Sequence, residues 1–278
     1  MDLYTKTTLN CSKLITQHYS TSFSLGIKTL HKTLHLPVYA IYGFVRYADE
    51  IVDTFHSYDK ASLLRRFKED TYRAIEEKIS LNPVLHSFQL VVNQYKIEHE
   101  LIDAFLHSME MDLKNETYNK DGYETYIYGS AEVVGLMCLR VFCDGDGQNY
   151  DTLKPSARRL GAAFQKVNFL RDLKSDFNER GRVYFPGINF ETFSETDKKK
   201  IEEDIASDFA AALEGIIRLP KSARAGVYLA YIYYLQLFKK IRKLPPTKIL
   251  SERIRVPDFR KAILLSKTLL LNKLNALG

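Results

Sequence analysis

The stretch Tyr42-Gly-Phe-Val-Arg-Tyr-Ala-Asp-Glu-Ile-Val-Asp53 places polar side chains along one side of a helix. At about 100° per residue, positions 42, 46, 49 and 53 fall within an arc of roughly 60°. A second stretch, Gln165-Lys-Val-Asn-Phe-Leu-Arg-Asp-Leu-Lys-Ser-Asp176, gathers positions 165, 168, 172 and 176 within roughly 80°. Each stripe carries two aspartates at i, i+4, a spacing at which like charges repel by about 0.2–0.5 kcal/mol. Two such stripes predict that a cation compensates them.

Acidic pairs are also common on solvated helix faces, and that alternative stays open for either stretch alone. Gln165 and Asn168 lie on the second stripe and add the oxygen donors that a hard metal ion such as Mg²⁺ prefers. The residues off this stripe are largely apolar. Two matching stripes therefore favour a shared metal site over two solvated faces.

Composition predicts an all-α protein. Of 278 residues, 45% are hydrophobic, and only 13 are Gly and 8 are Pro, so few residues interrupt long helices. No stretch shows the alternating pattern of a half-buried strand. Nothing resembles a linker, a repeat or a low-complexity tract, so we expect one domain over residues 1–278.

Local signals place the helix ends. Pro37 suits a helix start, Asp59 and Asn82-Pro83 suit N-caps, and Ser194-Glu-Thr-Asp197 resembles a capping box. The segment 144–147 is expected to be a turn, and 182–186 to be extended. The expected helices span residues 8–19, 38–52, 59–79, 84–95, 98–113, 123–142, 156–177, 194–219, 222–242 and 257–275.

Charge and cysteine content bear on location. Three cysteines in a chain of this length indicate reduced thiols in the cytoplasm. The N-terminus lacks the layout of a signal peptide, and no run of about 18 apolar residues is present. The chain from Lys239 onward carries 11 Lys/Arg and 2 Asp/Glu, so its net charge is +9. This basic tail could meet an anionic membrane surface or phosphate groups, whereas no nucleic-acid motif accompanies it.

Taken together, these motifs resemble the head-to-head prenyl synthases, the family of phytoene, dehydrosqualene and squalene synthases. The resemblance covers most of the chain and rests on Tyr-Ser-Thr-Ser-Phe (19–23), Ala-Ile-Tyr-Gly-Phe-Val-Arg (40–46), Asp49 with Asp53, Gly-Leu-Met (135–137), the Gln165 to Asp176 stretch, Arg-Gly-Arg-Val-Tyr-Phe-Pro (180–186) and Leu-Ser-Glu-Arg-Ile-Arg-Val (250–256). It implies a single antiparallel helical bundle of the isoprenoid synthase type around a central cavity. The two acidic motifs would face each other across its mouth.

The resemblance also implies roles for individual residues. Two or three Mg²⁺ ions, for which Mn²⁺ is a possible substitute, would bind Asp49, Asp53, Asn168, Asp172 and Asp176. The substrate diphosphates would be bound by His18, Ser20, Ser22, Tyr42, Arg46, Gln165, Arg171 and Lys248. Phe23, Ile27, Tyr39 and Gly135 would line the pocket, where Tyr128 and Tyr184 would join the four aspartates as catalytic residues facing a carbocation. Each aromatic could equally be a core residue, and Ser20 and Ser22 could simply cap a helix.

The implied reaction joins two prenyl diphosphates through a cyclopropylcarbinyl diphosphate and releases diphosphate. We expect two C20 geranylgeranyl diphosphates to give phytoene, a carotenoid precursor, without NADPH. The alternative is dehydrosqualene or squalene from two C15 farnesyl diphosphates. Small residues such as Gly26, Gly43 and Gly135 favour the longer substrate. An oily product predicts a cytoplasmic enzyme with peripheral contact at the inner membrane surface; the oligomeric state stays open.

Two departures from the family pattern leave residue roles open. Many members have Ala-Gly-Thr-Val-Gly where this chain has Ala-Glu-Val-Val-Gly (131–135), which puts the Glu132 carboxylate near the expected cavity wall. Lys248 stands near a position where an aromatic residue is common.

Two other functions remain as alternatives: a class I terpene cyclase acting on one substrate, and a non-enzymatic helical adaptor with solvated acidic faces.

Overall fold

The computed structural model describes residues 1–114, 119–178, 184–188, 192–254, 263–266 and 268, with the side chains of 175–178 excepted. Its described elements are all helical, as composition predicts. They are α1 (Leu3–Tyr19), α2 (Thr21–Thr29), α3 (Lys32–Asp53), α4 (Lys60–Glu77), α5 (Pro83–Tyr95), α6 (His99–Leu113), α7 (Lys120–Ile127), the π-helical η1 (Tyr128–Glu132), α8 (Val133–Cys143), α9 (Gly147–Asn178), α10 (Glu195–Ile216), α11 (Lys221–Arg242) and α12 (Pro246–Ser251).

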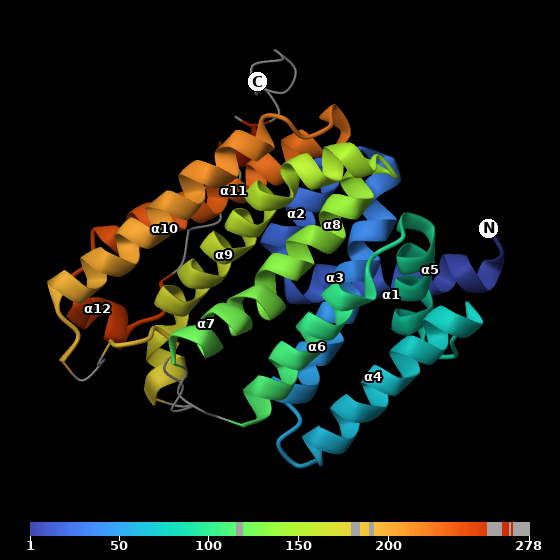
Figure 1. Ribbon diagram of the computed structural model, residues 1–278, viewed down its shortest axis with the longest axis horizontal. Coiled ribbons are helices and arrows are strands. Elements are labelled where there is room, and N and C mark those ends of the chain that lie inside the picture. The colour runs from blue at the N-terminus through green and yellow to red at the C-terminus, as the bar shows by residue number, and fades with distance from the viewer. Residues whose placement is uncertain (115–118, 179–183, 189–191, 255–262, 267, 269–278) are drawn as a thin grey trace.

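The helices pack around α9, which lies between α10 and α8 (Figure 1). On one side, α10, α11 and α12 pack against α9; on the other, α8 connects α9 to α3 and α6. The first acidic motif lies on α3, which packs against α1, α5 and α8. The second lies on α9. The two motifs are therefore carried by helices on opposite sides of α8.

Apolar side chains form two core clusters. The larger one is built mainly by α1 to α6 and α8, with the start of α9, and contains Phe44 stacked on Phe88 with ring centroids 3.9 Å apart. The smaller one is built mainly by α7 and α9 to α12, and contains Phe169 stacked on Tyr184 at 4.0 Å. Helix α3 buries its apolar face in the first and α9 in the second, so their polar stripes can meet where the clusters adjoin.

Several helix ends follow the local signals. Asp59 accepts a hydrogen bond from the Ser62 amide, and Asn82 caps α5 with Pro83 at the first helical position. Ser194 and Asp197 form the predicted capping box. In each case the signal is a short-range hydrogen bond that neighbouring residues supply by themselves.

Other helix ends differ from the prediction. Helix α1 begins at Leu3 rather than near residue 8, because Asp2 accepts a hydrogen bond from the Thr5 amide. Helices α3 and α9 begin well before the predicted positions and carry Pro37 and Pro155 inside them. Two short helices, α2 and α12, were not predicted at all.

The predicted helix over 123–142 is interrupted by η1, where the backbone winds into a π-helix. Gly129 lies against α6, and a Cβ there would come within 2.3 Å of the Ala104 carbonyl oxygen. Gly161 of α9 also approaches η1 closely, since a Cβ there would lie 2.8 Å from the Ala131 carbonyl oxygen. The wider π turn is thus held between two helices at positions where only glycine fits.

In the described part of the chain, the segment Lys120–Cys143 is long and apolar enough to cross a membrane by length and composition. Half of its most apolar stretch is buried inside the protein, where the segment packs against α6 and α9. A helix in the core of a bundle has the same composition, because it is apolar on most sides.

Candidate active site

The first acidic motif places a cation beside its carboxylates. On α3, the Arg46 guanidinium forms an ion pair with Glu50 and lies 3.9 Å from the Asp49 carboxylate. The ring of Tyr19, at the end of α1, lies beneath the same guanidinium at 4.4 Å. Stacking and pairing hold Arg46 in one orientation, as the binding of an anion requires.

Tyr42 lies one turn before Arg46 on the same face of α3. Its ring packs against Phe23 of α2 with centroids 4.8 Å apart, and its hydroxyl interacts with the Ser20 hydroxyl. Ser20 also accepts a hydrogen bond from the Phe23 amide. It therefore caps α2, which is the helix-capping role that the sequence left open for it. The break between α1 and α2 therefore brings Tyr19, Ser20 and Phe23 to the first motif.

Asp49 is the most strongly perturbed carboxyl of this motif. The pKa of Asp49 is raised to about 7, chiefly by burial; Arg46 opposes this rise, and the charges of Asp53 and Asp112 contribute to it. About a third of the side chain still meets solvent. A carboxyl that is poorly hydrated but accessible gains most from a bound cation, because the cation replaces the lost solvation.

On α9, the second motif brings together an amide pair and an ion pair. Asn168 Nδ2 faces Gln165 Oε1 at 3.5 Å. The Arg171 guanidinium binds both carboxylate oxygens of Asp172, with Nε at 3.1 and 3.0 Å from Oδ1 and Oδ2. Arg253, which follows α12, approaches the same carboxylate, with Nε 2.8 Å from Oδ1. Two guanidinium groups thus gather at one end of this stripe.

Tyr234 of α11 connects the two motifs. Its hydroxyl donates a hydrogen bond to Asn168 Oδ1 at 3.2 Å, and its phenol interacts electrostatically with Arg171 and Asp172. It also interacts electrostatically with Tyr42 of the first motif. Tyr234 therefore contacts the second motif directly and interacts electrostatically with the first, while the sharing of one site by the two stripes stays a prediction.

The donor set fits Mg²⁺ that is shared with a phosphate ligand. Across the described residues, no three His, Cys, Asp or Glu side chains gather into a ready-made metal site. Asp49, Asp53, Asp172 and Asn168 instead supply oxygen donors from two sides, and the Asp176 side chain lies outside the described residues. Mg²⁺ is bound in this way when substrate phosphates and water complete its shell.

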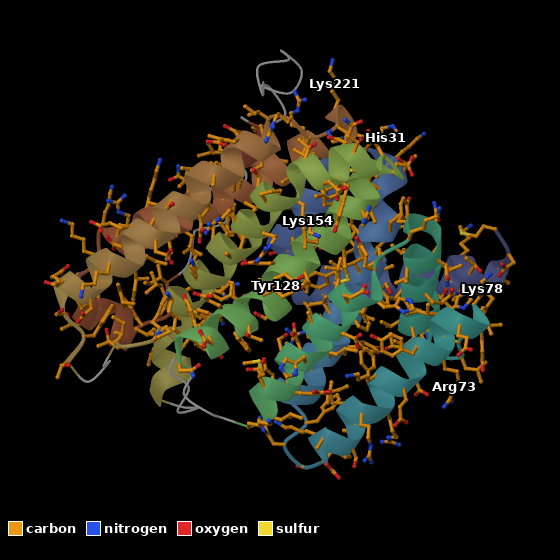
Figure 2. All side chains as sticks on the ribbon, in the orientation of Figure 1. His31, Arg73, Lys78, Tyr128, Lys154 and Lys221 are labelled. Atoms are coloured by element: carbon orange, nitrogen blue, oxygen red, sulfur yellow. The ribbon has the colours of Figure 1, made fainter. Side chains whose placement is uncertain are left out.

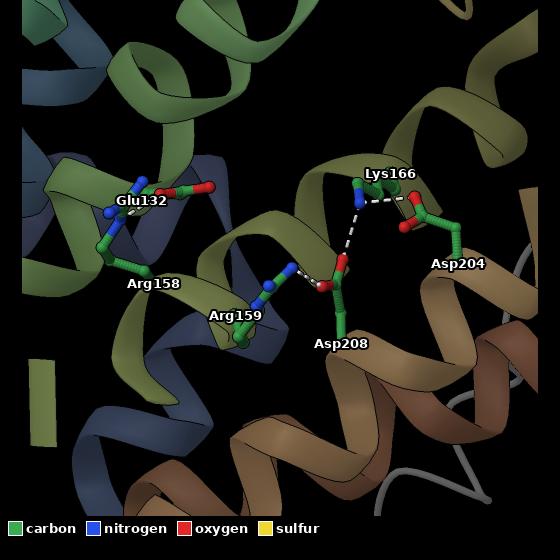
Figure 3. A network of polar contacts seen from close by, with 6 residues as sticks. All are labelled: Glu132, Arg158, Arg159, Lys166, Asp204 and Asp208. Atoms are coloured by element: carbon green, nitrogen blue, oxygen red, sulfur yellow. Dashed lines mark hydrogen bonds and ion pairs between the residues drawn. The ribbon is translucent and has the colours of Figure 1, made fainter. Parts of the chain in front are cut away.

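The Glu132 carboxylate, which departs from the family pattern, is paired with an arginine. It forms an ion pair with Arg158 of α9 at 2.5 Å, a contact visible in Figure 3. The Arg158 guanidinium also lies 5.0 Å from the ring of Tyr128, at the other end of η1. Figure 2 shows Tyr128 at the front of the bundle. One face of this predicted catalytic aromatic is therefore in contact with a guanidinium, and the carboxylate that departs from the family pattern is neutralised.

A buried ionic network fixes α9 from the side of α10. Lys166 is 7% exposed and binds Asp204 and Asp208 of α10 at 2.5 and 2.7 Å (Figure 3). Asp208 is fully buried and also accepts a hydrogen bond from Arg159 at 3.0 Å. Because Lys166 follows Gln165 directly, these contacts fix the rotation of α9 at the second motif.

The other residues predicted for the site differ in their exposure and packing. His18 is exposed in the last turn of α1, Ser22 is half-buried in α2, and Lys248 of α12 is exposed and pairs with Glu252 at 3.6 Å. Ile27 and Tyr39 are buried in the larger core cluster. Tyr184 is buried against Phe169 in the smaller one.

The glycines taken to favour a long pocket lie where helices touch. A Cβ on Gly43 would come within 2.7 Å of Ser12 Oγ, and one on Gly135 within 3.3 Å of the Ala157 carbonyl oxygen. Gly26 faces the backbone of Gly226. These positions are small because helices approach there, so they do not support an argument about substrate length.

Three residues of the site were not identified from the sequence. Asp112 of α6 is buried, accepts a hydrogen bond from Tyr126 at 2.9 Å and acts electrostatically on Asp49. Arg253 lies in the 250–256 stretch, which contributed to the family resemblance, but the sequence assigned no role to this arginine. Tyr234 is one of several tyrosines on α11, and nothing in its spacing distinguishes it from the others.

Comparisons with known proteins identify the family of the chain. Residues 16–260 match the family model for squalene/phytoene synthase. The chain is 25% identical over 276 residues to a phytoene synthase of Arthrospira platensis, with 90% of this chain and 89% of that protein covered. It is also 25% identical over 200 residues to a 4,4'-diapophytoene synthase of Staphylococcus haemolyticus, with 70% and 67% covered.

The fold is that of a solved relative. The crystal structure of a dehydrosqualene synthase in complex with a ligand superposes with a TM-score of 0.82 at 21% identity, covering 97% of this chain and 98% of that one. This similarity confirms the all-α terpenoid synthase fold. The chain belongs to the squalene/phytoene synthase family, whose enzymes are prenyltransferases that join two prenyl diphosphates head to head.

Proposed function

We propose that the protein condenses two C20 geranylgeranyl diphosphates to phytoene through a cyclopropylcarbinyl diphosphate. The family of the chain supports the reaction class, as do the hydrogen bond of Tyr234 to the second motif and its electrostatic interaction with Tyr42 of the first. The phytoene synthase that matches over nine tenths of this chain supports the C20 substrate. The alternative is dehydrosqualene or squalene from two C15 farnesyl diphosphates, which the diapophytoene synthase relative favours.

The residues of the site have distinct tasks in this proposal. Arg46 and Arg171 bind diphosphate oxygens with planar guanidinium groups, and Ser20 and Tyr42 donate hydrogen bonds to them. Asp49, Asp53, Asn168, Asp172 and Asp176 hold Mg²⁺. When bound, the metal neutralises charge on the leaving diphosphate. Each of the two stages releases one diphosphate and one proton, so the coupling that ends at phytoene needs no reductant.

The test is a set of incubations with purified protein. With Mg²⁺, we expect the C20 diphosphate to be coupled faster than the C15 diphosphate, and addition of NADPH to leave the product unchanged. Product chain length and unsaturation are measured by chromatography and mass spectrometry. Faster coupling of the C15 substrate would exclude the phytoene assignment, and an NADPH-dependent product would favour squalene. A product from a single prenyl diphosphate would instead indicate a terpene cyclase.

We also propose that the protein is cytoplasmic and contacts the inner membrane surface peripherally through its basic tail. Much of that tail (255–262, 267 and 269–278) lies outside the described residues. Each well-placed cation near anionic lipid contributes about 1 kcal/mol. We therefore expect binding to vesicles that contain anionic lipid, weaker binding to neutral vesicles, and release by salt in co-sedimentation. Binding that ignores both lipid charge and salt would contradict this docking surface.

A further inference from the structure

Tyr234 is held at both ends of its side chain. Its ring stacks on Phe164 of α9, with centroids 4.0 Å apart and planes inclined by 16°, and Tyr233 packs edge-on against it at 5.6 Å. Its hydroxyl donates a hydrogen bond to Asn168 Oδ1 at 3.2 Å. Phe164 and Asn168 are four residues apart and lie on the same face of α9. The ring therefore lies along α9 and its hydroxyl reaches the second motif.

The orientation of the Asn168 amide depends on this contact. A carbonyl oxygen has two lone pairs, and the Tyr234 hydroxyl engages one at Oδ1. On the other side of the amide, Nδ2 faces Gln165 Oε1 at 3.5 Å, which is a weak contact. The bond from Tyr234 is thus the stronger of the two, and it leaves the second lone pair of Oδ1 available to a cation.

We propose that Tyr234 is a positioning residue that orients Asn168 toward the metal between the two motifs. This inference rests on the proposed function, because it assigns Asn168 to the metal site described above. Tyr234 acts through Asn168 and does not itself bind the metal. Partners that orient a metal ligand in this way typically change metal affinity or activity by about 10- to 100-fold when they are lost.

The experiment measures binding of inorganic diphosphate to the protein by titration calorimetry at a series of Mg²⁺ concentrations, without prenyl substrate. Tyr234→Phe removes the hydroxyl and keeps the ring on Phe164. We expect the Mg²⁺ concentration that supports half-maximal binding to rise about 10- to 100-fold. Tyr231→Phe is the matched control: Tyr231 lies on the same helix but packs against Phe209, so we expect no change.

A second pair of variants separates positioning from a general structural role. In an Asn168→Ala background, Tyr234→Phe should cause no further change, because the residue through which it acts is gone. An equal loss in both backgrounds would overturn the positioning role. If Tyr234→Phe does not fold, Phe164→Leu keeps the hydroxyl but removes the stacking surface, and it should raise the Mg²⁺ requirement in the same direction; no rise would overturn the proposal.

The outcomes also separate this inference from the proposed function. Wild-type protein that binds no diphosphate with Mg²⁺ would overturn the proposed metal site. Wild-type binding together with an unaffected Tyr234→Phe variant would overturn only the role of Tyr234.

Discussion

We expect replacement of Asp49 or Asp172 by Asn to remove most head-to-head coupling while the helical fold stays intact. On α3 the Asp49 carboxylate lies 3.9 Å from the Arg46 guanidinium, and on α9 the Asp172 carboxylate is paired with Arg171. Because loss of an outer partner alone typically costs about 10- to 100-fold, we expect at least about a 100-fold loss of turnover for a direct ligand. Steady-state rates at saturating Mg²⁺ measure this, with circular dichroism as the check on folding.

Asp70→Asn is the matched control, because Asp70 lies on the exposed face of α4, where it pairs with Arg73 at 3.4 Å. The same substitution there should leave turnover unchanged. Asp53 and Asp176 complete the two motifs and should behave like Asp49 and Asp172. If two of the four motif variants retain wild-type activity, metal binding by both motifs is excluded.

Asp49→Asn has a second expected result, in metal-free protein. The pKa of Asp49 is about 7 in the folded protein against an ordinary value of 3.8. Between these values the folded state binds more protons than the unfolded state, so this carboxyl lowers the free energy of unfolding as the pH rises from about 4 to about 7. The Asn variant lacks that loss. The melting temperature of the Asn variant minus that of wild type should therefore increase from pH 4 to pH 8 in thermal scans with EDTA. A difference that stays constant over this range would contradict the raised pKa.

We expect replacement of Lys166 by Met to destabilise the protein by about 3–5 kcal/mol, the usual cost of removing one partner from a buried ion pair. Asp208 is fully buried and, among the described residues, would keep its hydrogen bond from Arg159, whose side chain is 59% exposed. The free energy of unfolding is measured by urea denaturation. A loss below about 1 kcal/mol would show that this network contributes little to stability.

Two further variants make that result specific. Lys199→Met removes an exposed lysine of α10 that lies 4.0 Å from Glu203, and should change stability by less than about 0.5 kcal/mol. A Lys166→Met, Asp208→Leu double variant removes both buried charges. It should recover part of the stability, since an apolar pair can replace a buried ion pair.

The sequence by itself determined the features that depend on near neighbours. The caps at Asp59, Asn82 and Ser194 were predicted because each satisfies amides within three residues. The two acidic stripes followed from helical spacing alone. The class of site followed from the same residues, because paired carboxylates with amide oxygens on two helices are suited to a hard cation and a charged ligand.

Only the tertiary structure decided features that depend on distant residues. A proline inside a helix costs about 3 kcal/mol, so local rules place helix ends near Pro37 and Pro155. Packing overrides this: Leu34 is buried before Pro37, and Tyr150 and Leu153 are buried before Pro155. The π turn of η1 likewise forms where Gly129 and Gly161 let α6 and α9 approach.

The partners within the site were also decided by the tertiary structure. Tyr234 reaches Asn168 across 66 positions of the chain, and Arg253 and Asp112 reach the motifs from α12's end and from α6. No local pattern distinguishes these residues from other tyrosines, arginines or aspartates. Their roles arise because the two core clusters bury the apolar faces of α3 and α9, and packing of α11 on α9 brings Tyr234 to the polar face of α9.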